Sequence, residues 1–191
     1  KKTTKKMEAK KIIITGGATR IGAAIARSLS GNEKQITLHY NQSEKEAKKL
    51  KTELERDGAK VFLIKADLSN SNSVKKIIPF SYKMMKGLDC LINNASIFEK
   101  DSIKDFNESK FNKHMNINLK APAILSQAFK KYVKNNKGNI VNIIDQRIFK
   151  LTPYFFSYTL SKSGLETLTK TSAMSLAPNI RVNGVAPGPT I

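Results

Sequence analysis

A tyrosine and a lysine four residues apart could carry acid–base chemistry. Tyr158-x-x-x-Lys162 lies in a segment, 156–177, whose sequence predicts a helix that ends near Pro178. Residues at i and i+4 face the same side of a helix, so the two side chains would lie together. A neighbouring ammonium favours the phenolate and is expected to lower the pKa of the Tyr158 phenol. The pair would then be a proton donor, although the same spacing also occurs between side chains that are merely solvated.

A glycine-rich segment near the start of the chain predicts a phosphate-binding turn. The sequence TGGATRIG at 15–22 follows an apolar run and opens a predicted helix. Glycines let the backbone approach a pyrophosphate, and the helix N-terminus offers N–H groups and a positive dipole end. The dipole disfavours a cation such as Arg20 in the first turn by about 0.3–1 kcal/mol. A bound phosphate would reverse that sign, and a solvated surface arginine is the alternative.

The residues after the second predicted strand favour a phosphorylated ribose. The stretch 39–43 contains no carboxylate, whereas NAD sites usually place an Asp or Glu about 20 residues after the glycines. Ser43 could also form a capping box with Glu46, a role that does not exclude phosphate binding. The sequence therefore predicts an NADP site that Arg20 forms with the neutral side chains of His39, Tyr40, Asn41 and Ser43.

Short apolar runs alternate with longer amphipathic stretches along the chain. This pattern predicts a mainly parallel sheet with helices on both faces, which is the doubly wound α/β (Rossmann) fold. A break at Pro79 is expected inside the third helix because proline lacks an N–H. The strands are predicted over 11–15, 35–40, 61–64, 88–92, 139–144 and 180–185, and the helices over 21–29, 43–56, 70–85, 108–134 and 156–177.

Length and composition limit the classes of protein to consider. The 191 residues suffice for one domain, expected over 10–191 behind a disordered basic segment, 1–9. The net charge is +19, but the lysines are scattered and far outnumber the arginines, so we expect no nucleic-acid partner. One cysteine and two distant histidines predict no metal site. No apolar run reaches the roughly 18 residues of a membrane span, and no signal peptide is visible, so a cytoplasmic protein is expected.

The ordered motifs resemble those of the short-chain dehydrogenase/reductase family over residues 10–191. The matches are T-G-x-x-x-x-x-G at 15–22, Asp67-Leu68, Asn93-Asn94-Ala95, Asn118, Y-x-x-x-K at Tyr158 and Lys162, and Pro187-Gly188. The resemblance implies an NAD(P)-dependent oxidoreductase whose complete chain forms a homo-oligomer, a dimer or a tetramer. Because family members are longer, we expect the usual seventh strand to be absent and the NADP-binding domain to be incomplete at its C-terminal side.

The resemblance also assigns roles to residues. Tyr158 would be the general acid, and Lys162 would lower its pKa and hold the nicotinamide ribose. Asn118 would support a water in a proton relay: Pro122 has no N–H, so the Asn118 carbonyl would be free to bind that water, unless the helix is a plain kinked core helix. The implied cofactor-binding residues are Gly16, Arg20, Ile21, Gly22, His39, Tyr40, Asn41, Ser43, Asp67, Leu68, Asn94, Ala95, Ser96, Lys162, Pro187, Gly188 and Thr190.

Two departures from the family pattern concern the substrate. Arg20 stands where a third glycine is common, and Asp145 stands where a serine is common, thirteen residues before the tyrosine. Both look like the pteridine reductases of the family, in which a phenylalanine two residues past N-N-A-S stacks on the pterin. Phe98 matches that position. A flat heteroaromatic ring between Phe98 and the nicotinamide is a sensible arrangement, and a carboxyl group could protonate its ring nitrogen.

We therefore expect NADPH-dependent hydride transfer to a pteridine-like substrate of the dihydropteridine or dihydrofolate type. The alternative is a carbonyl or 3-oxoacyl reductase of the same family. In that case the aspartate at 145 would be a substitution unrelated to pteridines, and Phe98 would be a core aromatic under a loop. An NADP-binding protein without turnover is the alternative outside catalysis. The catalytic set is Tyr158, Lys162, Asp145 and Asn118, and the substrate-binding set is Ser96, Phe98, Asp145 and Tyr158.

Overall fold

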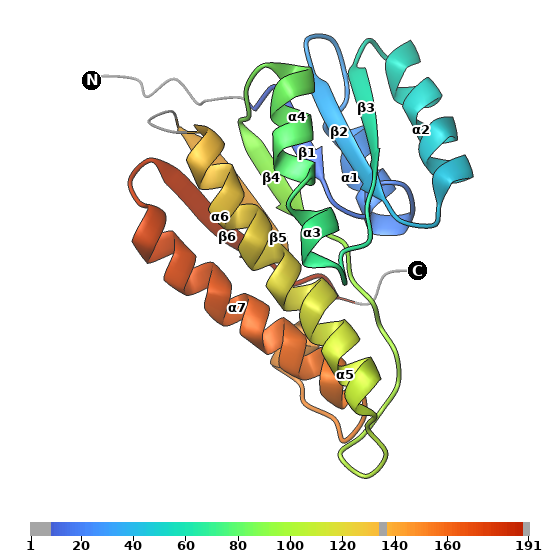
Figure 1. Ribbon diagram of the computed structural model, residues 1–191, viewed down its shortest axis with the longest axis vertical. Coiled ribbons are helices and arrows are strands. Elements are labelled where there is room, and N and C mark those ends of the chain that lie inside the picture. The colour runs from blue at the N-terminus through green and yellow to red at the C-terminus, as the bar shows by residue number, and fades with distance from the viewer. Residues whose placement is uncertain (1–8, 134–136, 189–191) are drawn as a thin grey trace.

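Six short strands form one parallel sheet. The computed structural model describes residues 9–133 and 137–188. The strand order is β3-β2-β1-β4-β5-β6, and every neighbouring pair is parallel (Figure 1). The predicted doubly wound α/β fold is confirmed. The strands are β1 Lys11–Ile14, β2 Gln35–Tyr40, β3 Lys60–Lys65, β4 Cys90–Asn93, β5 Gly138–Ile143 and β6 Ile180–Val185.

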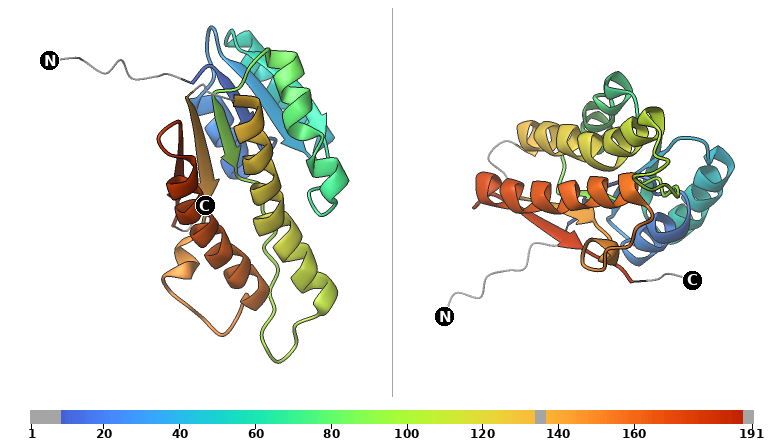
Figure 2. Two further views of the ribbon diagram at one scale, coloured as in Figure 1. Left: turned by 60° about the vertical axis from the view of Figure 1, so that its left-hand side comes forward. Right: turned by 90° about the horizontal axis from the view of Figure 1, so that it is seen from below.

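Helices cover both faces of the sheet. One face packs against α1 and α2, and the other against α4, α6 and α7 (Figure 2). Because the central strand β1 is covered on both sides, its residues Ile12, Ile13 and Ile14 are apolar and buried. The helices are α1 Arg20–Ser28, α2 Glu44–Arg56, α3 Ser71–Val74, α4 Ile77–Met85, α5 Glu108–Met115, α6 Ala121–Val133 and α7 Phe156–Leu176, with a π-helical turn at Asn116–Lys120 and a 3-10 turn at Gln146–Ile148.

The ends of neighbouring strands bring distant segments together. Ile14, the last residue of β1, pairs with Leu38 of β2 and Ile92 of β4. Asn93, the last residue of β4, pairs with Asn142 of β5. The glycine-rich turn after β1, the N-N-A-S segment after β4 and the residues after β5 therefore leave the sheet at the same edge. In open α/β sheets, ligands bind at this edge.

Two predicted helices are interrupted. The segment expected over 70–85 forms α3 and α4, and the break precedes Pro79 instead of falling on it. Pro79 lies in the first turn of α4, where a missing N–H leaves no helical bond unmade. The helix expected over 108–134 forms α5, the π-helical turn and α6, and residue 134 lies outside the described residues. The π-helical turn ends just before Pro122, the residue that cannot donate to Asn118.

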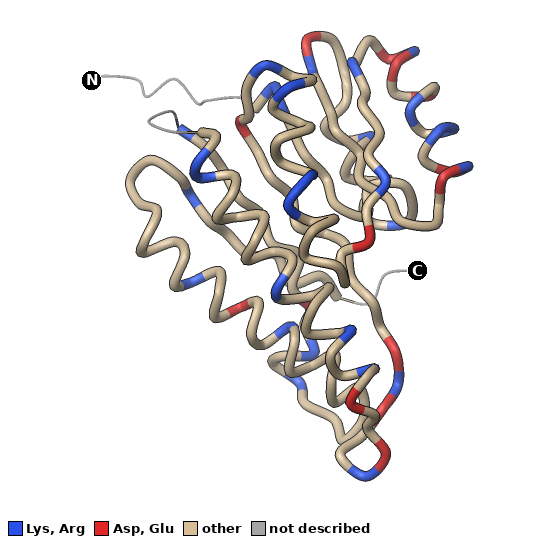
Figure 3. Tube along the Cα trace, in the orientation of Figure 1, with Lys and Arg blue, Asp and Glu red and all other residues tan. Residues whose placement is uncertain are grey.

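Two predictions concern the ends of the chain: a disordered segment over residues 1–9 and the absence of a seventh strand. Residues 1–8 of the expected disordered segment lie outside the described residues, whereas Ala9 already packs against the core. Strand β6 pairs with β5 and forms one edge of the described sheet, with no further strand beside it there. None of the described helices is long and apolar enough to cross a membrane. Lysines and arginines are spread over both halves of the fold (Figure 3).

Candidate active site

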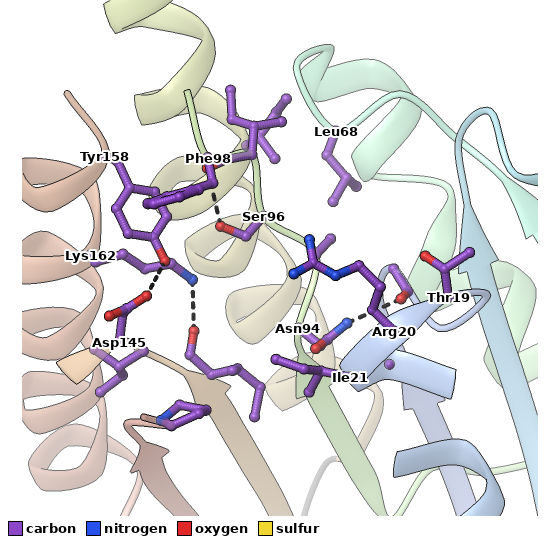
Figure 4. Close-up of a pocket in the computed structure, with 18 of the residues that line it drawn as sticks. Thr19, Arg20, Ile21, Leu68, Asn94, Ser96, Phe98, Asp145, Tyr158 and Lys162 are labelled. Atoms are coloured by element: carbon purple, nitrogen blue, oxygen red, sulfur yellow. Dashed lines mark hydrogen bonds between the residues drawn. The ribbon is translucent and has the colours of Figure 1, made fainter. Parts of the chain in front are cut away.

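A cleft of about 500 Å³ opens where β1, β4 and β5 end (Figure 4). This volume lies within the range of about 300–1,000 Å³ that is usual for small-molecule sites. Arg20 and Thr19 border one side of the cleft, and Tyr158 and Asp145 border the other. The predicted site residues that line it are Gly16, Arg20, Ile21, Gly22, His39, Asn41, Asp67, Leu68, Asn94, Ala95, Ser96, Phe98, Asp145, Tyr158, Lys162, Pro187 and Gly188.

The glycine-rich turn is held in place from the side of β4. The Thr15 hydroxyl oxygen accepts the backbone N–H groups of Asn94 at 3.0 Å and Ala95 at 3.1 Å. The Asn94 amide in turn donates to the carbonyls of Thr15 at 2.9 Å and Gly16 at 3.1 Å. A Cβ on Gly16, whose φ is +60°, would lie only 2.9 Å from the Ala95 Cα. Asn94 therefore fixes the shape of a turn that requires glycine.

His39 holds the same turn from the side of β2. The Gly16 N–H donates to His39 Nδ1 at 3.1 Å, so Nε2 carries the proton and donates to the Ala66 carbonyl at 2.9 Å. The side chain is buried, and burial lowers the pKa of His39, which favours the neutral form that both bonds require. Direct binding of the cofactor phosphate by His39 was predicted, but both ring nitrogens are occupied by backbone. Its contribution is to position Gly16.

Helix α1 begins without the usual means of neutralising its N-terminus. Thr19 makes no side-chain capping bond, and the first turn holds no acidic residue. Its backbone N–H groups are thus suited to an anion. Arg20 has a φ of +48°, a left-handed conformation that costs about 1–2 kcal/mol for a residue with a Cβ. Its side chain extends across the cleft toward Ser96 (Figure 4). A cation is therefore held in a backbone conformation that glycine would adopt more easily.

The end of β2 contributes fewer residues to the cleft than predicted. Asn41 lines it, but Tyr40 is buried in an apolar cluster and does not. Ser43 makes no capping bond, so the predicted capping box does not form, and Ser43 does not line the cleft either. The first carboxylate after β2, on Glu44, pairs with Lys48 at 2.6 Å on the surface of α2. No acidic side chain therefore borders the cleft at this strand end.

Tyr158 and Asp145 form a short hydrogen bond at the other end of the cleft. The Tyr158 hydroxyl donates to Asp145 Oδ2 at 2.6 Å, and Asp145 Oδ1 accepts the Arg147 backbone N–H at 2.8 Å. Burial raises the pKa of Tyr158, and the hydrogen bond to Asp145 and the charge of that carboxylate raise it further. The prediction that this pKa is lowered is therefore wrong. Desolvation and the adjacent carboxylate outweigh the Ser96 hydroxyl and the Arg147 charge, which act to lower this pKa.

Lys162 is buried beneath Tyr158 and points at the end of β5. Its ammonium donates to the Ile143 carbonyl at 2.8 Å and lies 5.7 Å from the centre of the Tyr158 ring. Burial lowers the pKa of Lys162 to about 8, although the negative charge of Asp145 acts to raise it. Two of its three N–H donors remain for other partners. The ammonium therefore faces the cleft with unused donors at the position where the resemblance places the nicotinamide ribose.

Asn118 lies behind the cleft and does not line it. Its side chain is buried, with Oδ1 accepting the Ile97 N–H at 2.9 Å. Its Nδ2 donates to the Ile97 carbonyl at 3.1 Å and to Ser161 Oγ at 3.0 Å. The side chain thus ties the segment after β4 to helix α7. A relay through Asn118 would have to use its backbone carbonyl, which stays a prediction.

Aromatic rings and an arginine form the wall beside Tyr158. Phe98 is 51% exposed, so it is not a core aromatic. Its ring stacks on Phe155, with centres 4.3 Å apart and planes within 5°, and meets Tyr158 edge-on at 4.7 Å. The Arg147 guanidinium lies 4.4 Å from the Phe155 ring centre and 5.2 Å from that of Phe98. Phe155 and Arg147 were not predicted from the sequence, although both lie within three residues of a predicted catalytic residue.

Comparison with known proteins decides the family. A profile of the short chain dehydrogenase family matches residues 10–191. The chain belongs to this family. It is 32% identical over 185 residues to an uncharacterized oxidoreductase of Thermotoga maritima, covering 95% of this chain and 72% of the relative. It is 31% identical over 179 residues to human dehydrogenase/reductase SDR family member 4, covering 92% and 64%. The described fold and site are thus those of an oxidoreductase. The chain spans only part of the length of these two relatives.

Two solved structures with bound NADP superpose closely on this one. FolM alternative dihydrofolate reductase 1 of Brucella canis, complexed with NADP, is 38% identical with a TM-score of 0.89, over 94% of this chain and 73% of that chain. A short chain dehydrogenase of Burkholderia cenocepacia, also in complex with NADP, is 30% identical with a TM-score of 0.91, over 95% and 75%.

Asp67 and Pro187 of this short-chain dehydrogenase were also predicted from the sequence, and both line the cleft. The Asp67 Oδ1 accepts the N–H and the hydroxyl of Ser69, each at 2.8 Å. The Pro187 carbonyl accepts the Gln146 N–H at 3.3 Å, which connects the end of β6 to the residues after β5. Thr190 lies outside the described residues. Among the described residues, no group of three or more His, Cys, Asp or Glu side chains could hold a metal ion.

Proposed function

We propose that this protein is an NADPH-dependent reductase of a pteridine-like ring, of the dihydropteridine or dihydrofolate type. The observation that carries the proposal is the 2.6 Å bond from Tyr158 to the Asp145 carboxylate, beside the half-exposed Phe98 ring. A ketone reductase must stabilise a developing oxyanion next to the tyrosine, which a carboxylate would repel. A pterin instead offers N–H donors and a basic ring nitrogen, which suit a carboxyl group.

The cofactor end of the cleft fits a dinucleotide with an extra phosphate. The uncapped N-terminus of α1 and the tightly held glycine turn suit a pyrophosphate. Asn41 lines the cleft at the end of β2, and the first carboxylate that follows this strand, on Glu44, does not line it. Arg20 lines the same cleft from the start of α1 and offers a cation for a 2′-phosphate. Lys162 has donors left for ribose hydroxyls. When bound, NADPH supplies the hydride. The structures of FolM alternative dihydrofolate reductase 1 and of the Burkholderia relative, both with NADP, support this choice.

Tyr158 and Asp145 would deliver the proton as a pair. Two anionic oxygens 2.6 Å apart are strongly disfavoured, so the pair retains at least one proton. Reduction of a C=N bond adds the hydride to carbon and a proton to nitrogen. The pair passes its proton to that nitrogen and takes up another from solvent in the same step, so that two anionic oxygens never lie side by side, and the Lys162 ammonium offsets the remaining negative charge. The high pKa of Tyr158 suits this role because the proton stays on the pair until the nitrogen becomes basic.

The direct test is NADPH oxidation by the complete gene product with a panel of substrates. We expect turnover with 7,8-dihydropteridines and little or none with 3-oxoacyl thioesters and simple ketones. Preference for the oxoacyl compounds would identify a carbonyl reductase of the same family and overturn the proposal. Tight NADPH binding without turnover of any substrate would favour the cofactor-binding alternative.

Replacing Arg20 by glycine tests the preference for NADPH. Loss of a charged partner for the 2′-phosphate should raise the Kd of NADPH by about 10–100-fold, the worth of a charge-assisted hydrogen bond of about 1.5–3 kcal/mol. The Kd of NADH should change little because NADH lacks that phosphate. Titration of cofactor fluorescence measures both constants. Glycine adopts the +48° φ of this position without strain, so the melting temperature should not fall. Equal weakening of both cofactors would contradict the assignment.

A further inference from the structure

Arg147 is the one charged side chain of the aromatic wall, and the proposed reaction gives it no task. It lines the cleft two residues after Asp145, in the 3-10 turn Gln146–Ile148. Its guanidinium rests beside two rings, 4.4 Å from the Phe155 centre and 5.2 Å from the Phe98 centre. Stacking on ring faces restricts where the guanidinium can move but leaves its N–H groups, which point outward in its plane, available for hydrogen bonds.

The guanidinium has no protein anion to pair with in the described part of the chain. None of the ion pairs or side-chain hydrogen bonds found there involves it. The nearest carboxylate in sequence, Asp145, already accepts from the Tyr158 hydroxyl and from the backbone N–H of Arg147 itself. An oriented arginine with unused donors in a ligand cleft is a ready partner for a planar anion, because its fork matches a carboxylate bidentately.

We propose that Arg147 binds a carboxylate on the substrate's side chain, so that the enzyme selects a pteridine with an anionic tail over one with a neutral tail. This inference rests on the proposed function and names its substrate class. Phe155 covers one face of Phe98, so the reacting ring would lie against the side of Phe98 that faces the cleft. Asp145 and Tyr158 would contact the ring. A group attached to that ring would leave the cleft past Arg147, and the protein's net charge of +19 would attract an anion to it.

Folate and biopterin are suitable probes because they share the pterin ring. Folate carries a benzoylglutamate tail with two carboxylates, whereas the biopterin side chain is neutral. Titration of each into the NADP⁺-loaded full chain gives a Kd without turnover. We expect wild-type protein to bind folate more tightly, and Arg147→Gln to weaken folate by about 10–100-fold while changing biopterin less than about threefold. Arg147→Lys should recover part of the difference, and added salt should weaken folate binding more when residue 147 is a cation than when it is glutamine.

The outcomes separate this inference from the proposed function. Equal weakening of both ligands by Arg147→Gln, with Arg147→Lys no better, would show that Arg147 only supports the aromatic wall and would overturn the inference. Absence of any effect, or wild-type protein that fails to bind folate, would also overturn it. Turnover of dihydrobiopterin by wild type would in each case leave the proposed function standing. Failure of every dihydropteridine as a substrate would instead count against that function, whatever the binding of folate shows.

Discussion

Replacing Tyr158 by phenylalanine is expected to lower kcat for the reduced substrate by about 10²–10⁴, the usual contribution of a positioned general acid. The hydroxyl is half of the pair that holds the transferable proton, through its 2.6 Å bond to Asp145. The ring itself should remain in place, because it is buried and packs edge-on against Phe98. Steady-state NADPH oxidation by the complete gene product measures the loss.

Tyr154 offers a matched control for this substitution. It lies four residues earlier, is 50% exposed and does not line the cleft. Tyr154→Phe removes the equivalent hydroxyl from a tyrosine outside the site and should leave kcat within about twofold of wild type. The Kd of NADPH should barely move in either variant, since cofactor contacts are expected from other residues. Normal turnover by Tyr158→Phe would mean that Asp145 or a water supplies the proton alone, and the role of Tyr158 would be wrong.

The fold could be predicted from sequence because parallel strands covered on both faces form continuous apolar runs. Residues 12–14 illustrate this: three consecutive isoleucines, all buried, in the centre of the sheet. The same feature hides which side chain faces the cleft. In β2 the residues from Ile36 to Tyr40 are all buried. The sequence therefore could not show that His39 would bind backbone and that Tyr40 would enter the core, whereas Asn41, beyond the strand, reaches the cleft.

The site residues could be predicted where a motif fixes their spacing along the chain. The pKa of a side chain could not, because it depends on groups that only the fold brings together. The spacing of Tyr158 and Lys162 placed both at the cleft. The direction of the Tyr158 pKa was wrong because it depends on Asp145, thirteen residues away in the chain and 2.6 Å away in space. Phe155 was missed for a related reason. Its φ of +61° at the start of α7 turns its ring onto Phe98, and no propensity argument anticipates that conformation.

Asp145→Ser should separate a pteridine reductase from a ketone reductase. The carboxylate accepts the Tyr158 hydroxyl and would contact the pterin's N–H groups, so its loss should lower kcat/KM for dihydropteridines by about 10–100-fold, as expected for charge-assisted hydrogen bonds. Removing the carboxylate also removes two of the causes that raise the pKa of Tyr158. A tyrosine with a lower pKa beside a neutral hydroxyl suits a ketone oxygen, so any side activity on simple ketones should persist or rise.

Asp145→Asn is the control that keeps the shape of the side chain. The amide oxygen can still accept the Tyr158 hydroxyl, but the group can no longer share a proton with it. If proton supply is the role of Asp145, asparagine should fail on dihydropteridines as serine does. If Asp145 serves only to orient the 3-10 turn through its bond to the Arg147 N–H, asparagine should restore activity. Equal losses on pteridines and ketones in both variants would reduce Asp145 to a structural residue and remove the main support for a pteridine substrate.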